Sequence, residues 1–401
     1  MTPMSSWLLP ENISDVLPDE ARRVERLRRD LLDLYRVYGY EYVIPPLIEH
    51  LDSLLSGTDL ELDLRTFKLV DQTSGRSLGV RADATPQVAR IDAHILNRAG
   101  VVRLCYAGPV LHARPQHGLA SREPIQVGAE LYGDSSLEAD AEVLQLAARS
   151  LELAGARGVR IDLGHSGVLR AVLGGDAAAR ERIDPILSAL SSKDAAALRA
   201  VTATLSDSIR QPLLALADLH GGVDILNEAR RRLAHIDAVA RWLDELEILA
   251  ARCPVGSASI DLADLHGYRY YTGATFAAYA ANCPWPLLRG GRYDEIGRAF
   301  GRARPATGFS IVDLREAAQL GAAGPRPTAI AAPASGDGEL DALIAALRAQ
   351  GHIVVRGAVG AAQEGAFEFD RQIGRSGARW QVLAWDRGAA AAADRKGKNE
   401  A

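Results

Sequence analysis

Cysteine is scarce in this chain of 401 residues, which has only Cys105, Cys253 and Cys283. The three are odd in number, far apart in the sequence and free of CxxC spacing. This pattern excludes a disulfide framework and a cysteine-based zinc site. We expect reduced thiols that pack as small apolar side chains, as is usual for cytosolic proteins.

An excess of positive charge is also missing, because the formal net charge is -5. Arginine supplies most of the cations, and lysine occurs only at Lys68, Lys193, Lys396 and Lys398. A chain with this balance has no overall basic field that would attract nucleic acid or an anionic membrane. We therefore expect no nucleic acid and no membrane among its partners.

Long apolar runs are absent as well. No stretch approaches the length that a membrane-spanning helix needs, and the N-terminal residues lack the basic and apolar regions of a signal peptide. These absences predict a cytoplasmic location. The length and the 48% hydrophobic content suffice for about two or three domains with large cores.

The hydrophobic pattern predicts an antiparallel sheet flanked by helices. Residues 20–38 place apolar side chains on one broad helical face. Further helices are predicted at 86–98 and 137–154. Strands are predicted at 40–46, 66–72, 77–83, 101–116, 122–133, 159–164, 257–264, 274–280 and 307–314. Because hairpin signals rather than regular βαβ alternation connect these strands, we expect the fold class to be α+β.

The chain divides into a predicted core, residues 1–325, and a small α/β domain, residues 326–388. The core carries a helical insertion at about 167–253, where the sequence is rich in alanine and leucine. In the second domain we expect strands at 328–332, 352–356 and 380–385, with helices around 339–349 and 365–373. The tail, residues 389–401, has no pattern that buries surface and is predicted to be disordered.

Side chains suited to a small cationic ligand lie at the edges of predicted strands. Carboxylates can pair with an ammonium or imidazolium group, amides and hydroxyls orient the ligand, and tyrosine rings exclude water. Simpler alternatives exist: Asp83 could cap a helix, Glu130 could face solvent, and the tyrosines could be ordinary strand residues. The candidate binding residues are Asp83, Thr85, Gln126, Glu130, Tyr270 and Tyr271.

We expect no metal site and no cofactor. His112 and His117 lie five residues apart in a loop with proline and glycine, a spacing that makes no helical metal-binding pair. The glycine-rich segment RGGRYD, residues 289–294, lacks the spacing of either standard nucleotide-binding fingerprint.

Five motifs occur in the order found in histidyl-tRNA synthetases. RADATPQ, YAGPVLHARPQHG, IQVGAELYG, LHGYRYY, and GGRYD with GFSIVDLRE resemble successive motifs of that family, and the resemblance covers residues 1 to about 320. It implies a core like that of class II aminoacyl-tRNA synthetases and a self-dimer. It also places the six candidate binding residues on the family's histidine-contacting positions.

The resemblance fails at the positions that serve catalysis. Motif 2 reads VLHARPQ, which is one residue short, so its arginine is missing or displaced and its glutamate has become Ala113. The arginine of the histidine signature corresponds to His266, and the aspartate to Arg269, while the arginine of motif 3 remains at Arg315. Adenylate formation depends on guanidinium groups that stabilise the charged phosphate, and losing one such donor costs about two to three powers of ten in rate. We therefore predict no catalytic residues.

The segment SREPIQVGAELYG, residues 121–133, is similar to the corresponding segment of the regulatory subunits of ATP phosphoribosyltransferase, a family of synthetase paralogues. That resemblance implies a non-catalytic chain that forms a hetero-oligomer with a short catalytic subunit in the first step of histidine biosynthesis. It also implies activation and allosteric feedback inhibition by histidine. Four further residues are candidates for an additional part of the pocket: Arg81, Arg114, His266 and Arg269.

Two alternatives to this function share the same fold. One is an active histidyl-tRNA synthetase, and the other is a scaffold that binds the catalytic subunit without binding a ligand. The small C-terminal domain resembles a shortened anticodon-binding domain, and the acidic net charge argues against RNA recognition by it.

Overall fold

The computed structural model describes residues 8–56, 60–254, 258–281, 283–322, 324–357 and 367–385. One compact unit holds the described residues between 22 and 322, and a second holds the described residues from 324 onward. In the described part of the chain, no helix has the length and apolar character needed to cross a bilayer. The tail predicted to be disordered, residues 389–401, lies outside the described residues.

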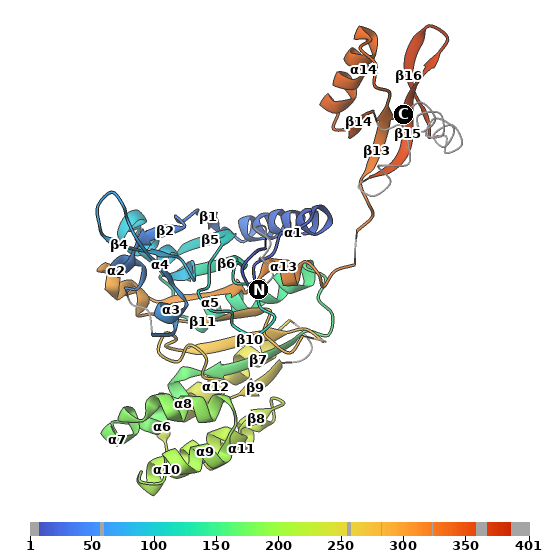
Figure 1. Cartoon of the computed structure of the whole chain (residues 1–401). Helices are drawn as coiled ribbons and strands as arrows, with labels where there is room; N and C mark the ends of the chain where they lie inside the picture. The colour runs from blue at the N-terminus through green and yellow to red at the C-terminus, as the bar shows by residue number, and fades with distance from the viewer. Residues whose placement is uncertain are drawn as a thin grey trace, which may run out of the picture. The chain divides into compact units, whose positions relative to one another are not determined.

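A nine-stranded sheet organises the first unit, in the order β1-β5-β6-β12-β11-β10-β7-β9-β8 (Figure 1). Its middle is antiparallel and consists of β5 (Val102–Pro109), β6 (Ile125–Tyr132), β12 (Ala306–Ile311), β11 (Leu288–Arg292), β10 (Ala274–Tyr279) and β7 (Arg160–His165). At the edges, β1 (Glu41–Tyr42) and β9 (Ala258–Asp261) pair in parallel with β5 and β7, and β8 (His220–Gly221) pairs with β9. The α+β prediction is confirmed.

Two long helices pack into the core on one face of this sheet. Helix α1 (Pro18–Val37) buries Val24, Leu27, Leu31 and Tyr35, which follow one another at intervals of three or four. The Tyr35 ring meets Phe309 of β12 edge to face, with ring centroids 5.8 Å apart. Helix α5 (Leu137–Leu153) belongs to the same core. This face of the sheet is therefore filled.

The other face carries shorter elements. The predicted helix at 86–98 is present as α4 (Thr85–Arg90), which continues as the π-helical segment η1 (Ile91–Leu96). A three-stranded sheet, β2 (Ile48–His50), β4 (Ser77–Val80) and β3 (Phe67–Val70), stands beside it with α2 (Leu51–Leu54) and α3 (Leu60–Arg65). Element η2 (Ile296–Phe300) completes this part of the unit, whereas α13 (Leu314–Ala317) buries Leu314 and Ala317 in the core that contains α1 and α5.

Residues 166–252 are almost wholly helical and occupy the green region of Figure 1. Aspartates begin two of the helices, because Asp176 and Asp194 accept hydrogen bonds from backbone N–H groups in the first turns of α7 and α9. The helices are α6 (Ser166–Leu173), α7 (Ala177–Glu181), α8 (Ile183–Ser191), α9 (Ala195–Val201), α10 (Asp207–Asp218), α11 (Ile225–Arg232) and α12 (Asp237–Arg252).

The second unit is a four-stranded sheet in the order β14-β13-β15-β16 with one helix. Strands β13 (Thr328–Ala332), β14 (Val354–Arg356) and β16 (Arg379–Ala384) and helix α14 (Gly338–Ala349) match their predictions. The helix predicted around 365–373 is wrong, because residues 368–376 form strand β15. This strand pairs with both β13 and β16, and Gly377, with a φ of 62°, makes the tight turn into β16.

Candidate functional site

The open face of the nine-stranded sheet is the floor of a cavity of about 780 Å³. Glu130 of β6 pairs in register with Gly308 of β12, and Ser310 of β12 pairs with both Gly128 of β6 and Arg289 of β11. Side chains at paired positions, and at every second residue from them, point to the same face of a sheet. Polar residues from three adjacent strands therefore share this face.

Glycines keep the floor low enough for a ligand. A Cβ at Gly308 would overlap the Oε2 atom of Glu130, and a Cβ at Gly128 would lie 2.5 Å from the hydroxyl of Tyr106. A side chain at either position would point to the cavity side of the sheet. The space above β6 and β12 therefore depends on the absence of two side chains.

Glu130 lies at the centre of the site and is 1% exposed. Its Oε1 accepts hydrogen bonds from Thr85 Oγ1 and from the Tyr106 hydroxyl, both at 3.1 Å, and its Oε2 accepts a short one from the Tyr293 hydroxyl. Burial raises the pKa of Glu130 to about 8, and the nearby charge of Asp83 adds to the rise, while the three hydrogen bonds oppose it. Near neutral pH the empty site therefore keeps this carboxyl group largely protonated, and a bound cation would favour its ionised form.

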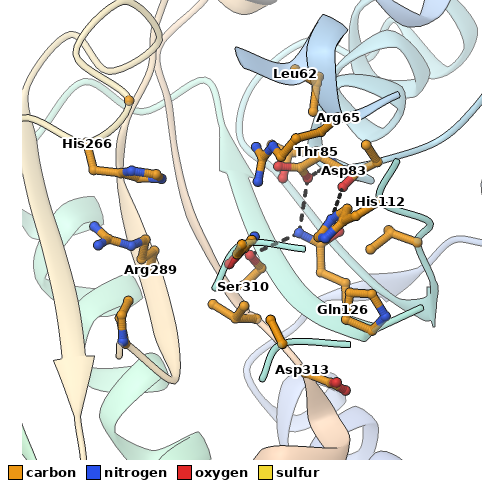
Figure 2. A pocket seen from close by; sticks show the side chains of 18 of the residues that line it. Leu62, Arg65, Asp83, Thr85, His112, Gln126, His266, Arg289, Ser310 and Asp313 are labelled. Carbon is orange, nitrogen blue, oxygen red and sulfur yellow. Dashed lines mark hydrogen bonds between the residues drawn. The ribbon is translucent and has the colours of Figure 1, made fainter. Parts of the chain in front are cut away.

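A second carboxylate lies on the same side of the cavity. Asp83 Oδ1 accepts hydrogen bonds from the Thr85 N–H at 2.9 Å and from Gln126 Nε2 at 3.1 Å, and Gln126 Nε2 also donates to Ser310 Oγ (Figure 2). Gln126 Oε1 in turn accepts from the Ala84 N–H at 2.9 Å. Asp83 thus lines the cavity and also accepts a hydrogen bond from the first residue of α4, although the N-cap position of that helix is Ala84.

The segment from Leu265 to Tyr271 covers the floor as a series of turns, not as a strand. The Tyr270 ring stacks on Tyr293 with centroids 4.9 Å apart and meets Tyr271 edge to face at 5.1 Å. The Tyr270 hydroxyl is buried and has no hydrogen-bond partner among the described residues. A buried hydroxyl without a partner in a cavity wall is a ready contact for a ligand.

All six candidate binding residues line this one cavity, as do Arg114 and His266. Arg81 and Arg269 are not among its lining residues. The buried Arg81 guanidinium donates to the carbonyls of Pro45 and Pro109, both at 2.8 Å, and these bonds satisfy donors that lie away from water. Arg269 turns outward and pairs with Asp184 at 2.5 Å.

The motifs did not single out several other lining residues. Tyr293 and Arg289 lie on either side of Gly291 at the cavity end of β11, and Ser310 lies on β12. Arg65 ends α3, and its Nε is buried without a hydrogen-bond partner among the described residues. A sequence signal existed for the strand residues, because alternation along RGGRY puts Arg289 and Tyr293 on one face.

The arginine that the sequence keeps from motif 3 lies outside the cavity lining. Arg315, the arginine of motif 3, is 8% exposed and donates to both carboxylate oxygens of Asp313, at 3.1 to 3.3 Å. It is not among the residues lining the cavity, whereas Asp313 is. Burial lowers the pKa of His112, so this side chain adds no positive charge at neutral pH. The guanidinium kept from motif 3 is thus neutralised by its neighbour.

The raised pKa of Glu130 predicts how stability depends on pH. The folded protein holds a proton on Glu130 up to about pH 8, whereas the unfolded chain releases it at the usual pKa of 4.5, so stability falls as pH rises between these values. Glu130→Gln lacks this effect. Chemical unfolding should show the wild-type free energy of unfolding falling, relative to the variant, on the order of 3 kcal/mol from pH 5 to pH 8. A constant difference would show that Glu130 is already ionised at pH 5.

The fold and site define a protein of the class II aminoacyl-tRNA synthetase type. A crystal structure titled as an ATP phosphoribosyltransferase regulatory subunit/histidyl-tRNA synthetase from Bacillus halodurans is 27% identical, with a TM-score of 0.79 over 92% of this chain and 98% of that one. A histidyl-tRNA synthetase structure from Nostoc shares the fold at 18% identity, with a TM-score of 0.72 over 95% of this chain and 97% of that one.

Family models and curated relatives give the particular family. The histidyl-tRNA synthetase model matches residues 12–316, and the model of the ATP phosphoribosyltransferase subunit HisZ C-terminal domain matches residues 327–383. Regulatory subunits of ATP phosphoribosyltransferase from Ralstonia nicotianae and Cupriavidus necator are 54% and 55% identical, each covering 94% of this chain and 98% of the relative. The chain belongs to the ATP phosphoribosyltransferase regulatory subunit family.

Proposed function

We propose that this chain is a non-catalytic regulatory subunit that binds free histidine in the cavity and transmits its occupancy to a catalytic ATP phosphoribosyltransferase subunit. The observation that carries the proposal is the convergence of the six candidate binding residues on one cavity, around the buried carboxyl group of Glu130. The histidine-contacting half of a synthetase site is kept, and the half that handles the nucleotide is altered.

The chemistry of the cavity suits histidine. A carboxyl group with a pKa near 8 can meet an imidazole in either charge state, as carboxylate with imidazolium or as carboxylic acid with neutral imidazole. Asp83 offers a second acceptor for an ammonium group, and the free hydroxyl of Tyr270 offers a further contact. Buried, directional groups of this kind discriminate strongly against ligands that leave them unpaired.

Two of the groups that the synthetases use for adenylate formation are replaced or held outside the lining of the same cavity. Ala113 supplies only a methyl group where the synthetases place a glutamate, and Arg315 is held by Asp313 away from the lining. Catalysis of this step requires preorganised positive charge at the phosphate. A histidine that is bound and not consumed can act as a signal.

A signal requires a partner whose state it changes. The names of the relatives call them regulatory subunits, which supports a catalytic ATP phosphoribosyltransferase subunit as the partner of this chain. On the resemblance to the synthetases we further propose that the partner is the short form, that a self-dimer forms the core of the hetero-oligomer, and that the complex lies in the cytoplasm. Feedback inhibition then requires histidine to bind one state of the complex more tightly than another.

Reconstitution with the short catalytic subunit tests the proposal. Phosphoribosyl transfer should rise when this chain is added and fall again when histidine is added, and calorimetry should show histidine binding to this chain alone. Activation without histidine binding would favour the scaffold alternative. Histidine-dependent exchange of pyrophosphate into ATP at a synthetase-like rate would favour an active synthetase and overturn the proposal.

A further inference from the structure

The cavity holds arginines as well as carboxylates, and one of them is placed across from the histidine-binding side. Arg289 lies on β11, and Figure 2 shows it with His266 on the side of the cavity opposite Asp83 and Gln126. Its side chain is 25% exposed, and its ion pair with Asp264 has an N–O distance of 3.4 Å. Charge-assisted hydrogen bonds are about 2.7–2.9 Å long, so this pairing is weak.

The strand register aligns Arg289 with the acidic groups. Arg289 pairs with Ser310 of β12, and Ser310 pairs with Gly128 of β6, which lies midway between Gln126 and Glu130. Strands β6 and β11 are therefore separated by β12 alone, a distance of roughly 10 Å. Strand β12 itself places only the small residues Gly308 and Ser310 on the cavity side at this level.

This span matches a free amino acid with an imidazole side chain. From bond lengths of about 1.5 Å, histidine extends about 6 Å from its carboxylate to the far ring nitrogen, and the side chains at either end close the remaining gap. Tyr271 bridges the two sides: a Cβ at Gly291, two residues along β11, would lie 3.0 Å from its ring. The charges of Arg289, Asp83 and Glu130 all reach the Tyr271 hydroxyl and shift its pKa, which burial raises.

We propose that Arg289 binds the α-carboxylate of the amino acid in this cavity and so selects free histidine over histidine whose carboxyl group is blocked. This inference rests on the proposed function and adds a specificity residue to it. The synthetase motifs place their catalytic arginines elsewhere, in motif 2 and in the histidine signature. Arg289 on β11 thus supplies a positive charge at a position that those motifs leave unassigned.

Calorimetry of the full-length chain with L-histidine and L-histidinamide tests this assignment. Histidinamide keeps the imidazole and the amino group and lacks the carboxylate charge. Wild-type protein should bind histidine about 10- to 100-fold more tightly than histidinamide, as expected for a lost hydrogen bond to a charged group. In Arg289→Gln, the affinity for histidine should fall by that factor and the affinity for histidinamide should stay the same. The dissociation constants of the two ligands should then be about equal.

Arg65→Gln is the matched control, because Arg65 lines the same cavity and Figure 2 shows it on the other side from Arg289. It should leave the wild-type preference for histidine unchanged. The assignment is overturned if Arg289→Gln still binds histidine more tightly than histidinamide by the wild-type factor, or if its affinity for both ligands falls equally. It is also overturned if Arg65→Gln, and not Arg289→Gln, removes the preference for histidine. Wild-type protein that binds neither ligand would refute the proposed function itself, and with it this inference.

Discussion

Glu130→Gln is expected to weaken histidine binding at least about 30-fold, since removing one partner of a buried, hydrogen-bonded charge pair costs about 2–5 kcal/mol. The amide keeps the volume of the side chain and loses the ability to ionise when a cationic ligand binds. Three hydroxyl groups would then surround a group that cannot ionise. Calorimetric titration of the folded variant measures the effect directly.

Glu316→Gln provides the control for Glu130→Gln. Glu316 lines the same cavity, where it accepts a hydrogen bond from Trp285 Nε1 at 3.2 Å, and it lies outside the network around Glu130. We expect its replacement to change histidine affinity by less than about threefold, the range of a partly exposed charge. Equal losses in the two variants would mean that net cavity charge, and not the Glu130 position, governs binding.

Gly308→Ala is expected to abolish histidine binding and to lower the free energy of unfolding by about 1–3 kcal/mol, the usual cost of overpacking. The new Cβ would overlap the Glu130 carboxylate and lie 2.8 Å from the backbone oxygen of Ala129. Neither neighbour can move freely, because β12 and β6 are paired along this stretch. Chemical unfolding and histidine titration measure the two effects.

Gly118→Ala tests whether any glycine near the site would behave in the same way. Gly118 lies in the loop that follows the lining residue His117, and a Cβ there would meet no heavy atom within 4 Å. This variant should keep wild-type stability and histidine affinity. Wild-type binding by Gly308→Ala itself would show that the carboxylate of Glu130 does not occupy the place described above.

Local patterns predicted most of the fold. The spacing of Leu27, Leu31 and Tyr35 identified α1, and alternation identified β5 and β6, because helices and strands with one buried face carry these periods. The error at residues 368–376 arose where the pattern was weak: this strand of the second unit is stabilised by its pairing with β13 and β16, which no local window contains.

Site residues could be predicted where a family motif names their position. They could not be predicted where tertiary contacts determine the conformation of a segment or the direction of a side chain. Asp83 and Glu130 came from the motifs and lie in one cavity. The turn conformation around Tyr270 depends on stacking against Tyr293, more than twenty positions along the chain. The orientation of the Arg81 side chain depends on its hydrogen bonds to the carbonyl groups of Pro45 and Pro109, which are distant in sequence. Arg289 was overlooked because the motif assigns it no role.

The ion pair between Arg315 and Asp313 limits what a single substitution could do in the cavity. Suppose that one mutation added an arginine to the segment VLHARPQ. Arg315 would still be bound to its neighbour, so a phosphate in the cavity would gain only one new cation. Releasing Arg315 alone would likewise leave that segment unchanged. Two separate changes would therefore be needed to supply guanidinium groups at both positions.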